Sequence, residues 1–276
     1  MSIGRCALIL LLAAGILSKA IAAAGLVFDP AGNLYLLGAN PSTIFKFTPD
    51  GAATKFAVAP AGEDWVGITV DGQGNVFVAT DAQPKRDVIT RILKFAPSGK
   101  RTVYVANVAA GQPKTLTSDR NGNLFVGLIS VAKPRGSDAI YKVASGTKRT
   151  TVFTTQITDP TLLAFDNAGN LYVYDESGKI SKLAPNGSEI SSMTSRETYD
   201  LACDQTGNLF VALPHSSEIE KVAPDGSKVP FATGVDPWFL AIDKTGNIFV
   251  LNNGIEKFSP DGQQRTTFAP NPISDQ

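Results

Sequence analysis

The sequence predicts an all-β protein, a six-bladed β-propeller of four-stranded antiparallel blades. Three observations predict this fold. A turn-and-strand string, Asp-x-x-Gly-Asn followed by an apolar run, occurs six times, beginning at Asp29, Asp71, Asp119, Asp166, Asp204 and Asp243. The spacings of 42, 48, 47, 38 and 39 residues lie near the period of about 40 that propeller blades have. Each copy also carries four short strand signals rich in β-branched and aromatic residues.

The four strands of a copy differ in composition. The first ends at the turn Asp, and the second follows Gly-Asn with apolar residues at successive positions, as in Leu209 to Val211. Such a run predicts a strand that is covered on both faces by neighbouring blades. The fourth strand is more polar, as an outer edge should be, for example Glu189 to Met193. The third strand has the form Ile-x-Lys-apolar, and its six lysines are Lys46, Lys94, Lys142, Lys182, Lys221 and Lys257.

Two tight turns join these strands. In Asp-x-x-Gly the Asp side chain is expected to cap a type I turn, and Gly supplies the positive φ that rejoins the strands. The second turn is Pro-Asp-Gly or a variant of it, and only copy three lacks the Pro, with Ala144 to Gly146 in its place. Because each third-strand lysine approaches the face of the turn Asp, we expect structural Lys–Asp pairs there, with the lysine stems packed between blades.

The pattern of an apolar strand, D-x-x-G-N-[LIV]-[FY]-V, I-x-K-[FVL] and P-D-G resembles the NHL repeat, and it covers all six copies. The resemblance implies a six-bladed propeller, with blades at about 25–60, 61–109, 110–157, 158–195, 196–234 and 235–276. Members of that family include extracellular sensor domains, protein-binding modules and RNA-binding modules. The related gluconolactonase-type propellers are metal-dependent hydrolases, and the chain is distantly similar to them.

Residues 1–24 have the composition of a secretory signal peptide. Arg5 precedes an apolar run from Cys6 to Leu17, and A-x-A sites allow cleavage after Ala22 or Ala24. The run is shorter than the roughly 20 residues that span a bilayer, so we expect cleavage and no membrane span afterwards. The expected location is therefore the periplasm or the exterior of the cell.

Charge and rare residues restrict the possible functions. The formal net charge is 0, and removal of Arg5 and Lys19 makes it −2, which argues against a nucleic-acid partner. The mature chain holds one cysteine, Cys203, for which we expect the role of a small apolar side chain. The one histidine, His215, lies in a loop and is interpreted as a surface residue.

Binding is expected on the face opposite the Asp turns, where blade crossovers and second-to-third strand loops vary in length. The two longest of these loops, 79–91 and 127–139, are adjacent and basic. They could form a raised basic lip that recognises an anionic group, or they could be solvated loops. The candidate residues of the lip are Lys85, Arg86, Lys133 and Arg135.

A second pattern lies seven residues before each turn Asp. These positions hold Asp64, Gln112, Asp159, Glu197 and Asp236, with Trp65, Tyr199 and Trp238 beside them. Equivalent repeat positions predict four carboxylates around the mouth of the central channel. They could bind a divalent cation such as Ca²⁺, or form a mouth for a polyhydroxylated ligand. Alternatively, Asp before Pro, as at Asp159 and Asp236, only shapes the crossover turn.

Two functions remain open. The first is an exported binding or interaction scaffold, expected to be monomeric, with a protein or cell-envelope ligand and no cofactor. The alternative is a metal-dependent hydrolase of lactones or esters at the channel mouth, for which an acidic and Asn donor set is required. Its candidate oxygen ligands are Glu63, Asp64, Asp159, Asp236 and Asn252. The last copy keeps its own fourth strand, so we expect the ring to close by packing of the first and last blades.

Overall fold

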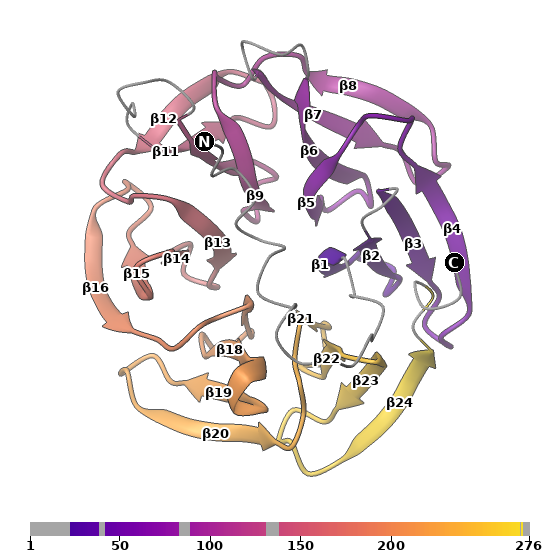
Figure 1. Cartoon of the computed structure of the whole chain (residues 1–276), viewed down its shortest axis with the longest axis vertical. Helices are drawn as coiled ribbons and strands as arrows, with labels where there is room; N and C mark the ends of the chain where they lie inside the picture. The colour runs from indigo at the N-terminus through magenta and orange to yellow at the C-terminus, as the bar shows by residue number, and fades with distance from the viewer. Residues whose placement is uncertain (1–22, 39–41, 83–88, 131–137, 271, 273–276) are drawn as a thin grey trace, which may run out of the picture.

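The computed structural model describes residues 23–38, 42–82, 89–130, 138–270 and 272. These residues form six four-stranded sheets arranged in a ring (Figure 1). In every sheet the strands follow one another in sequence and pair antiparallel. The predicted six-bladed propeller is therefore confirmed. Within the described ranges, no helix is long and apolar enough to cross a membrane.

The strands of blades 1 to 3 are β1 (Ala23–Phe28), β2 (Leu34–Gly38), β3 (Thr43–Phe47), β4 (Ala53–Val58), β5 (Trp65–Val70), β6 (Val76–Ala82), β7 (Ile89–Phe95), β8 (Arg101–Val105), β9 (Gln112–Ser118), β10 (Leu124–Ile129), β11 (Ala139–Val143) and β12 (Thr150–Thr154). Those of blades 4 to 6 are β13 (Pro160–Phe165), β14 (Leu171–Asp175), β15 (Lys179–Leu183), β16 (Glu189–Thr194), β17 (Asp200–Cys203), β18 (Leu209–Leu213), β19 (Glu218–Val222), β20 (Lys228–Thr233), β21 (Phe239–Ile242), β22 (Ile248–Leu251), β23 (Gly254–Phe258) and β24 (Arg265–Pro270). A short 3₁₀ turn, η1 (Pro214–Ser216), joins β18 to β19.

Burial follows the predicted order of the strands. The second strands are buried along their length, as β14 and β18 show, whereas the fourth strands, such as β16, lie mostly exposed on the rim (Figure 1). Apolar side chains of adjacent blades fill the spaces between them. Blade 1 packs on blade 6 in the same way, with Phe47 and Leu36 in one core with Phe249 and Ile255. The ring therefore closes by packing, and each blade keeps its own four strands.

The Asp-x-x-Gly-Asn turns are the same in all six blades. Their glycines have φ between +74° and +88°, as predicted for the turn. The sequence interpretation missed the role of the following Asn, whose side-chain amide donates to the turn carboxylate at 2.6 to 2.8 Å in every blade. Each turn is thus fixed by an Asp–Asn pair. In the second turn of blade 3, which lacks Pro, the positive φ falls on Lys148, at 56°, rather than on Gly146.

The expected Lys–Asp pairs are largely wrong. Only Lys182 reaches its turn carboxylate, with Nζ 3.1 Å from Oδ2 of Asp166. The six lysines instead lie over the aromatic ring directly opposite them on the second strand, with Nζ 5.0 to 5.7 Å from the ring centroid. The antiparallel register sets these neighbours, as with Tyr35 and Lys46. Cation–π contact is therefore the interaction that all six lysines share, and Lys182 adds an ion pair to Asp166 even though Asn170 bonds to the same oxygen.

Candidate functional site

A central channel of about 600 Å³ runs between the innermost strands. We name its two ends by the loops around them. The turn face carries the Asp-x-x-Gly-Asn turns, and the crossover face carries the blade crossovers and the second-to-third strand loops. Each innermost strand ends at a turn Asp, so residues at its start lie at the crossover face. There the channel is lined by Gly25, Gly67, Lys114, Glu176, Tyr199 and Asp200.

The crossover end of the channel is uneven. Blades 1 and 2 contribute glycines, and an added Cβ on Gly67 would lie 2.6 Å from the backbone nitrogen of Leu116. Blades 3 to 5 contribute charged and phenolic groups. A second hollow, of about 510 Å³, lies on the rim between blades 4 and 5. In this hollow Lys228 Nζ lies 3.0 Å from Oε1 of Glu220, so the two charges neutralise each other. The channel is therefore the better candidate for a functional site.

Asp159 is the one predicted crossover acid that lies against charged channel residues. It has a left-handed φ of 51° although it precedes Pro160, a combination that is disfavoured and that concentrates at functional sites. Asp138 holds it there, because Oδ2 of Asp138 accepts the Asp159 backbone N–H at 2.9 Å. The other oxygen of Asp138 accepts the Ser130 backbone N–H at 2.9 Å. One carboxylate thus contacts the backbone of both Ser130 and Asp159.

The Asp159 and Glu176 carboxyl groups are close enough for Glu176 to raise the pKa of Asp159. Burial raises the pKa of Asp159; the Lys114 cation opposes this rise, and the Glu176 and Asp138 carboxylates add to it. One oxygen of Asp159, Oδ1, is buried without a hydrogen-bond partner among the described residues. Lys114 Nζ lies 3.9 Å from Oε1 of Glu176. Two neighbouring carboxyl groups beside a cation, one of them with a raised pKa, can act as acid and base.

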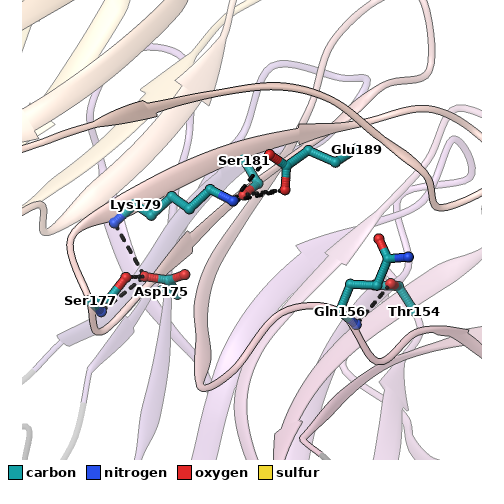
Figure 2. A network of polar contacts seen from close by, with 7 residues as sticks. All are labelled: Thr154, Gln156, Asp175, Ser177, Lys179, Ser181 and Glu189. Carbon is teal, nitrogen blue, oxygen red and sulfur yellow. Dashed lines mark hydrogen bonds and ion pairs between the residues drawn. The ribbon is translucent and has the colours of Figure 1, made fainter.

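The loop that carries Glu176 is held by a polar network (Figure 2). Oδ1 of Asp175 accepts the backbone N–H groups of Ser177 at 2.9 Å and Lys179 at 3.2 Å, together with the Ser177 hydroxyl. Lys179 in turn pairs with Glu189 on β16 at 2.8 Å. Asp175 is buried, so this capped turn fixes where Glu176 leaves β14 and enters the channel.

The remaining predicted acids do not form a ring around the channel. Asp64, Glu197 and Asp236 are exposed and lie outside the channel lining. The prediction that Trp65 lies at the channel mouth is wrong, because its side chain is only 3% exposed and packs in the core between blades 1 and 2. Its indole N–H donates to Glu63. The predicted ring of acids fails because the crossovers differ in shape. Residues at the same sequence distance from the turn Asp therefore do not occupy equivalent places around the channel.

An aromatic group on blades 5 and 6 contains two of the predicted residues. The rings of Tyr199 and Trp238 pack edge to face, with centroids 5.2 Å apart, and His215 packs against Tyr199 at 5.6 Å. Nε2 of His215 lies 3.2 Å from the Tyr199 hydroxyl and 3.2 Å from Oε2 of Glu197. His215, interpreted from sequence as a lone surface residue, is exposed but has two polar neighbours.

The basic lip predicted at Lys85, Arg86, Lys133 and Arg135 lies outside the described residues, and it stays a prediction.

Asp200 was not singled out by the sequence. It stands four residues before its turn Asp, where the other copies carry Gly25, Gly67, Thr115, Leu162 and Phe239. A charge at this otherwise uncharged position is the signal that could have found it. Its carboxylate accepts backbone N–H groups of Leu201 at 2.9 Å and Leu240 at 2.8 Å. Burial raises the pKa of Asp200 to about 7, although both hydrogen bonds lower it. It therefore links the innermost strands of blades 5 and 6.

Cys203 is a wall residue of the channel and packs against the core between blades 4 and 5. Burial raises the pKa of its thiol, so the reactive thiolate is disfavoured. This environment is consistent with the expected apolar role.

The oxygen donors suggested for a metal do not come together. Glu63 pairs with Arg101 at 2.7 Å, and Asn252 bonds within its own loop to Glu256 and Gly254. In the part of the chain that the structure describes, no group of three or more His, Cys, Asp or Glu residues is arranged to hold a metal ion. The residues present therefore do not fit the metal site of the hydrolase alternative.

The fold is shared with several solved structures. A gluconolactonase from Xanthomonas campestris superposes with a TM-score of 0.65 at 16% identity, over 84% of this chain and 83% of that one. Virginiamycin B lyase from Staphylococcus aureus gives a TM-score of 0.65 at 11% identity, over 90% and 84%. The calcium-binding protein regucalcin from Agrobacterium tumefaciens gives 0.62 at 15% identity, over 83% and 81%.

These superpositions show that the six-bladed propeller fold is shared, and nothing finer. No protein-family model and no curated protein sequence matches the chain. The NHL repeat itself thus stays a prediction from the sequence pattern.

Proposed function

We propose that the protein is an enzyme that hydrolyses a lactone or a related ester at the crossover end of its channel. The observation that carries this proposal is the Asp159–Glu176 carboxyl pair beside Lys114, at the mouth of an open channel. The superposed gluconolactonase and lyase favour an enzyme over a binding scaffold as the use of this fold.

In the proposed reaction, Glu176 is the base and Asp159 is the acid. Glu176 removes a proton from a water molecule, whose oxygen attacks the carbonyl carbon of the ester. The Lys114 cation stabilises the negative charge that develops on the carbonyl oxygen. The carbon–oxygen bond to the alcohol then breaks, and Asp159 donates its proton to the leaving oxygen. Transfer of the proton from Glu176 to Asp159 restores the pair, and the product is a hydroxy acid. No step is assigned to a metal, because the described donors do not form a metal site.

The raised pKa of Asp159 suits this division of roles. Burial keeps its carboxyl group protonated to higher pH than an exposed aspartic acid, which is required of a general acid near neutral pH. Glu176 is about half exposed, with 48% of its side-chain surface accessible, so a water molecule can reach it. Asp138 acts as a positioning residue, since its carboxylate accepts the backbone N–H groups of Asp159 and Ser130.

We further infer that the chain is exported as an NHL-type propeller after cleavage of the signal peptide within residues 1–24, at Ala22 or Ala24. β1 begins at Ala23, so cleavage after Ala22 would leave every strand whole. The periplasm or the exterior, a monomeric state and a protein or cell-envelope partner are part of this hypothesis. Edman sequencing of the secreted protein tests the cleavage, and a start at any residue beyond Gly25 would contradict it.

The test is a hydrolysis screen with purified residues 23–276. Glucono-δ-lactone, aliphatic γ- and δ-lactones and p-nitrophenyl acetate are followed with a pH indicator, first in EDTA. We expect hydrolysis that persists in EDTA and falls about 10²- to 10⁴-fold in Glu176→Gln. Lys114→Met should lower kcat by at least tenfold with a smaller change in KM.

Asp225→Asn, on the turn face, is the matched control and should leave the rate unchanged. Two results would overturn the proposal: no hydrolysis of any compound in the panel, or activity that Glu176→Gln leaves intact. A rate that appears only after addition of Ca²⁺ would instead support the separate hypothesis of a divalent cation at the channel mouth.

A further inference from the structure

The aromatic group on blades 5 and 6 meets the channel of the acid pair only through Tyr199, because its other members lie outside the channel lining. It is formed by Tyr199, His215 and Trp238, and we call it the aromatic corner. The Glu197 carboxylate contacts His215, and Asp236 stands two residues before Trp238 in the chain. Its rings are nearly perpendicular to one another, with interplanar angles of 84° for Tyr199 and Trp238 and 72° for Tyr199 and His215. Rings set at such angles form adjoining walls rather than a stack.

The two tryptophans of the chain differ in burial. Trp65 and Trp238 stand at neighbouring repeat positions, six and five residues before their turn Asp. Trp65 is buried between blades and donates its indole N–H to Glu63. Trp238 is half-buried, and its indole N–H has no partner among the described residues. A large aromatic side chain left partly open to solvent on a variable face is typical of a binding surface.

The charge around the corner is negative. Glu197 has 59% of its side chain accessible and lies within 3.2 Å of His215. Asp236 is exposed, and its Oδ1 accepts the Ser217 hydroxyl at 2.7 Å. Two nearby cations have other partners: Arg196 donates to the Ser216 hydroxyl at 3.1 Å, and Arg265 pairs with Glu256 at 2.9 Å and donates to the Gly234 carbonyl oxygen at 3.4 Å. Burial and the Glu197 charge both raise the pKa of Tyr199, which agrees with a negative potential at the ring.

We propose that the aromatic corner binds an organic cation, an alkylammonium or trimethylammonium group carried by a small molecule. The faces of Trp and Tyr rings attract such cations, most strongly where water is partly excluded. The two carboxylates add to this attraction, whereas a neutral sugar or alkyl group would gain nothing from their charge. The proposal does not rest on hydrolysis, because none of these side chains belongs to the acid pair.

Choline and its neutral isostere 3,3-dimethylbutan-1-ol are the probes. Titration of wild-type protein at low salt, followed by calorimetry and by tryptophan fluorescence, should show choline binding about tenfold more tightly than the isostere. The emission change should come from Trp238, since Trp65 is buried. Raising NaCl to about 0.5 M should weaken choline binding several-fold, because the Glu197 and Asp236 charges become screened.

Three variants separate the corner from the rest of the molecule. Glu197→Gln removes an exposed charge without loss of packing and should weaken choline several-fold while leaving the isostere unchanged. Trp238→Leu should weaken choline at least tenfold, and Trp238→Phe, which keeps a ring, should weaken it less. Asp225→Asn on the turn face should change neither. Equal affinities for the two probes would overturn the proposal, as would choline binding that both Glu197→Gln and Trp238→Leu leave intact, or no detectable binding of choline.

Discussion

The two faces of the propeller differ in how closely the six blades agree. On the turn face every blade repeats the same Asp–Asn contact, and every third-strand lysine lies over the ring opposite it. On the crossover face the blades diverge: blades 1 and 2 place glycines at the channel, blade 4 an acid pair, and blades 5 and 6 an aromatic corner. A feature that is repeated in every blade therefore stabilises the scaffold, whereas a departure from the repeat indicates a candidate functional residue.

The largest expected effect on stability lies on the turn face, at Gly187. This residue has φ of 86°, and an added Cβ would lie 2.6 Å from the carbonyl oxygen of Phe153 in the preceding blade. Gly226 occupies the equivalent turn of the next blade with φ of 88° but open space around it. Gly187→Ala should lower the free energy of unfolding by about 3 kcal/mol and Gly226→Ala by about 1 kcal/mol. Urea unfolding measures the free energy of unfolding of both variants. Equal losses would show that the contact between Gly187 and the preceding blade adds no steric cost.

Asp200 should make stability depend on pH on the crossover side. Its pKa is raised to about 7 in the folded protein, so between about pH 4 and 7 the folded state binds a proton that the unfolded state has lost. The free energy of unfolding should therefore fall, on the order of 2 kcal/mol, as the pH rises through this range. Asp200→Asn mimics the protonated group and should flatten this part of the profile. A profile that is the same in both proteins would contradict the assignment.

The turn carboxylates should matter more for folding than the exposed acids of the crossover face. Asp204 accepts backbone and side-chain bonds from Thr206 and Asn208. Burial disfavours its charge, but these bonds outweigh burial and lower the pKa of Asp204. Asp204→Ala should cost about 1 to 2 kcal/mol at pH 7, and this loss should vanish as the pH falls below the usual range of aspartic acid. Asp236→Ala should cost less than about 0.5 kcal/mol. Thermal unfolding at pH 7 and pH 3 compares them.

The smallest expected effect distinguishes two lysines within the repeated scaffold. Lys182 combines contact with the Tyr172 ring and a 3.1 Å pair with Asp166, whereas Lys221 has the ring contact with Phe210 alone. Lys182→Met should therefore destabilise the protein by about 0.5 kcal/mol more than Lys221→Met. Added salt should reduce this difference in a urea titration. A larger loss at Lys221 would mean that the ion pair contributes nothing.

The fold was predictable because its signals repeat. Six Asp-x-x-Gly-Asn turns and six Ile-x-Lys strands fix the number of blades, and local turn chemistry fixes their register. The packing of the lysines was predicted wrongly because a shared face does not make Lys and Asp neighbours. The antiparallel register places each lysine opposite an aromatic residue of the second strand instead, as with Tyr35 and Lys46.

The candidate site was only partly predictable. Spacing from the turn placed Asp159, Tyr199 and Trp238 on the crossover face, but it also placed Trp65 there, which the structure buries. Crossovers of different length bring different residues to the same point in space, so spacing is a poor guide on this face. Lys114, Glu176 and Asp138 come from three different segments, and nothing in their local sequence shows that they meet around Asp159.

The most direct test of the division between the faces compares Glu176→Gln with Asp204→Ala in two assays. Lactone hydrolysis and the free energy of unfolding are measured for both variants and the wild-type protein. We predict that Glu176→Gln loses about 10²-fold or more of the rate and keeps wild-type stability, whereas Asp204→Ala loses stability and keeps its rate while folded. The reverse result, in which Asp204→Ala abolishes hydrolysis in the folded protein and Glu176→Gln does not, would contradict the account.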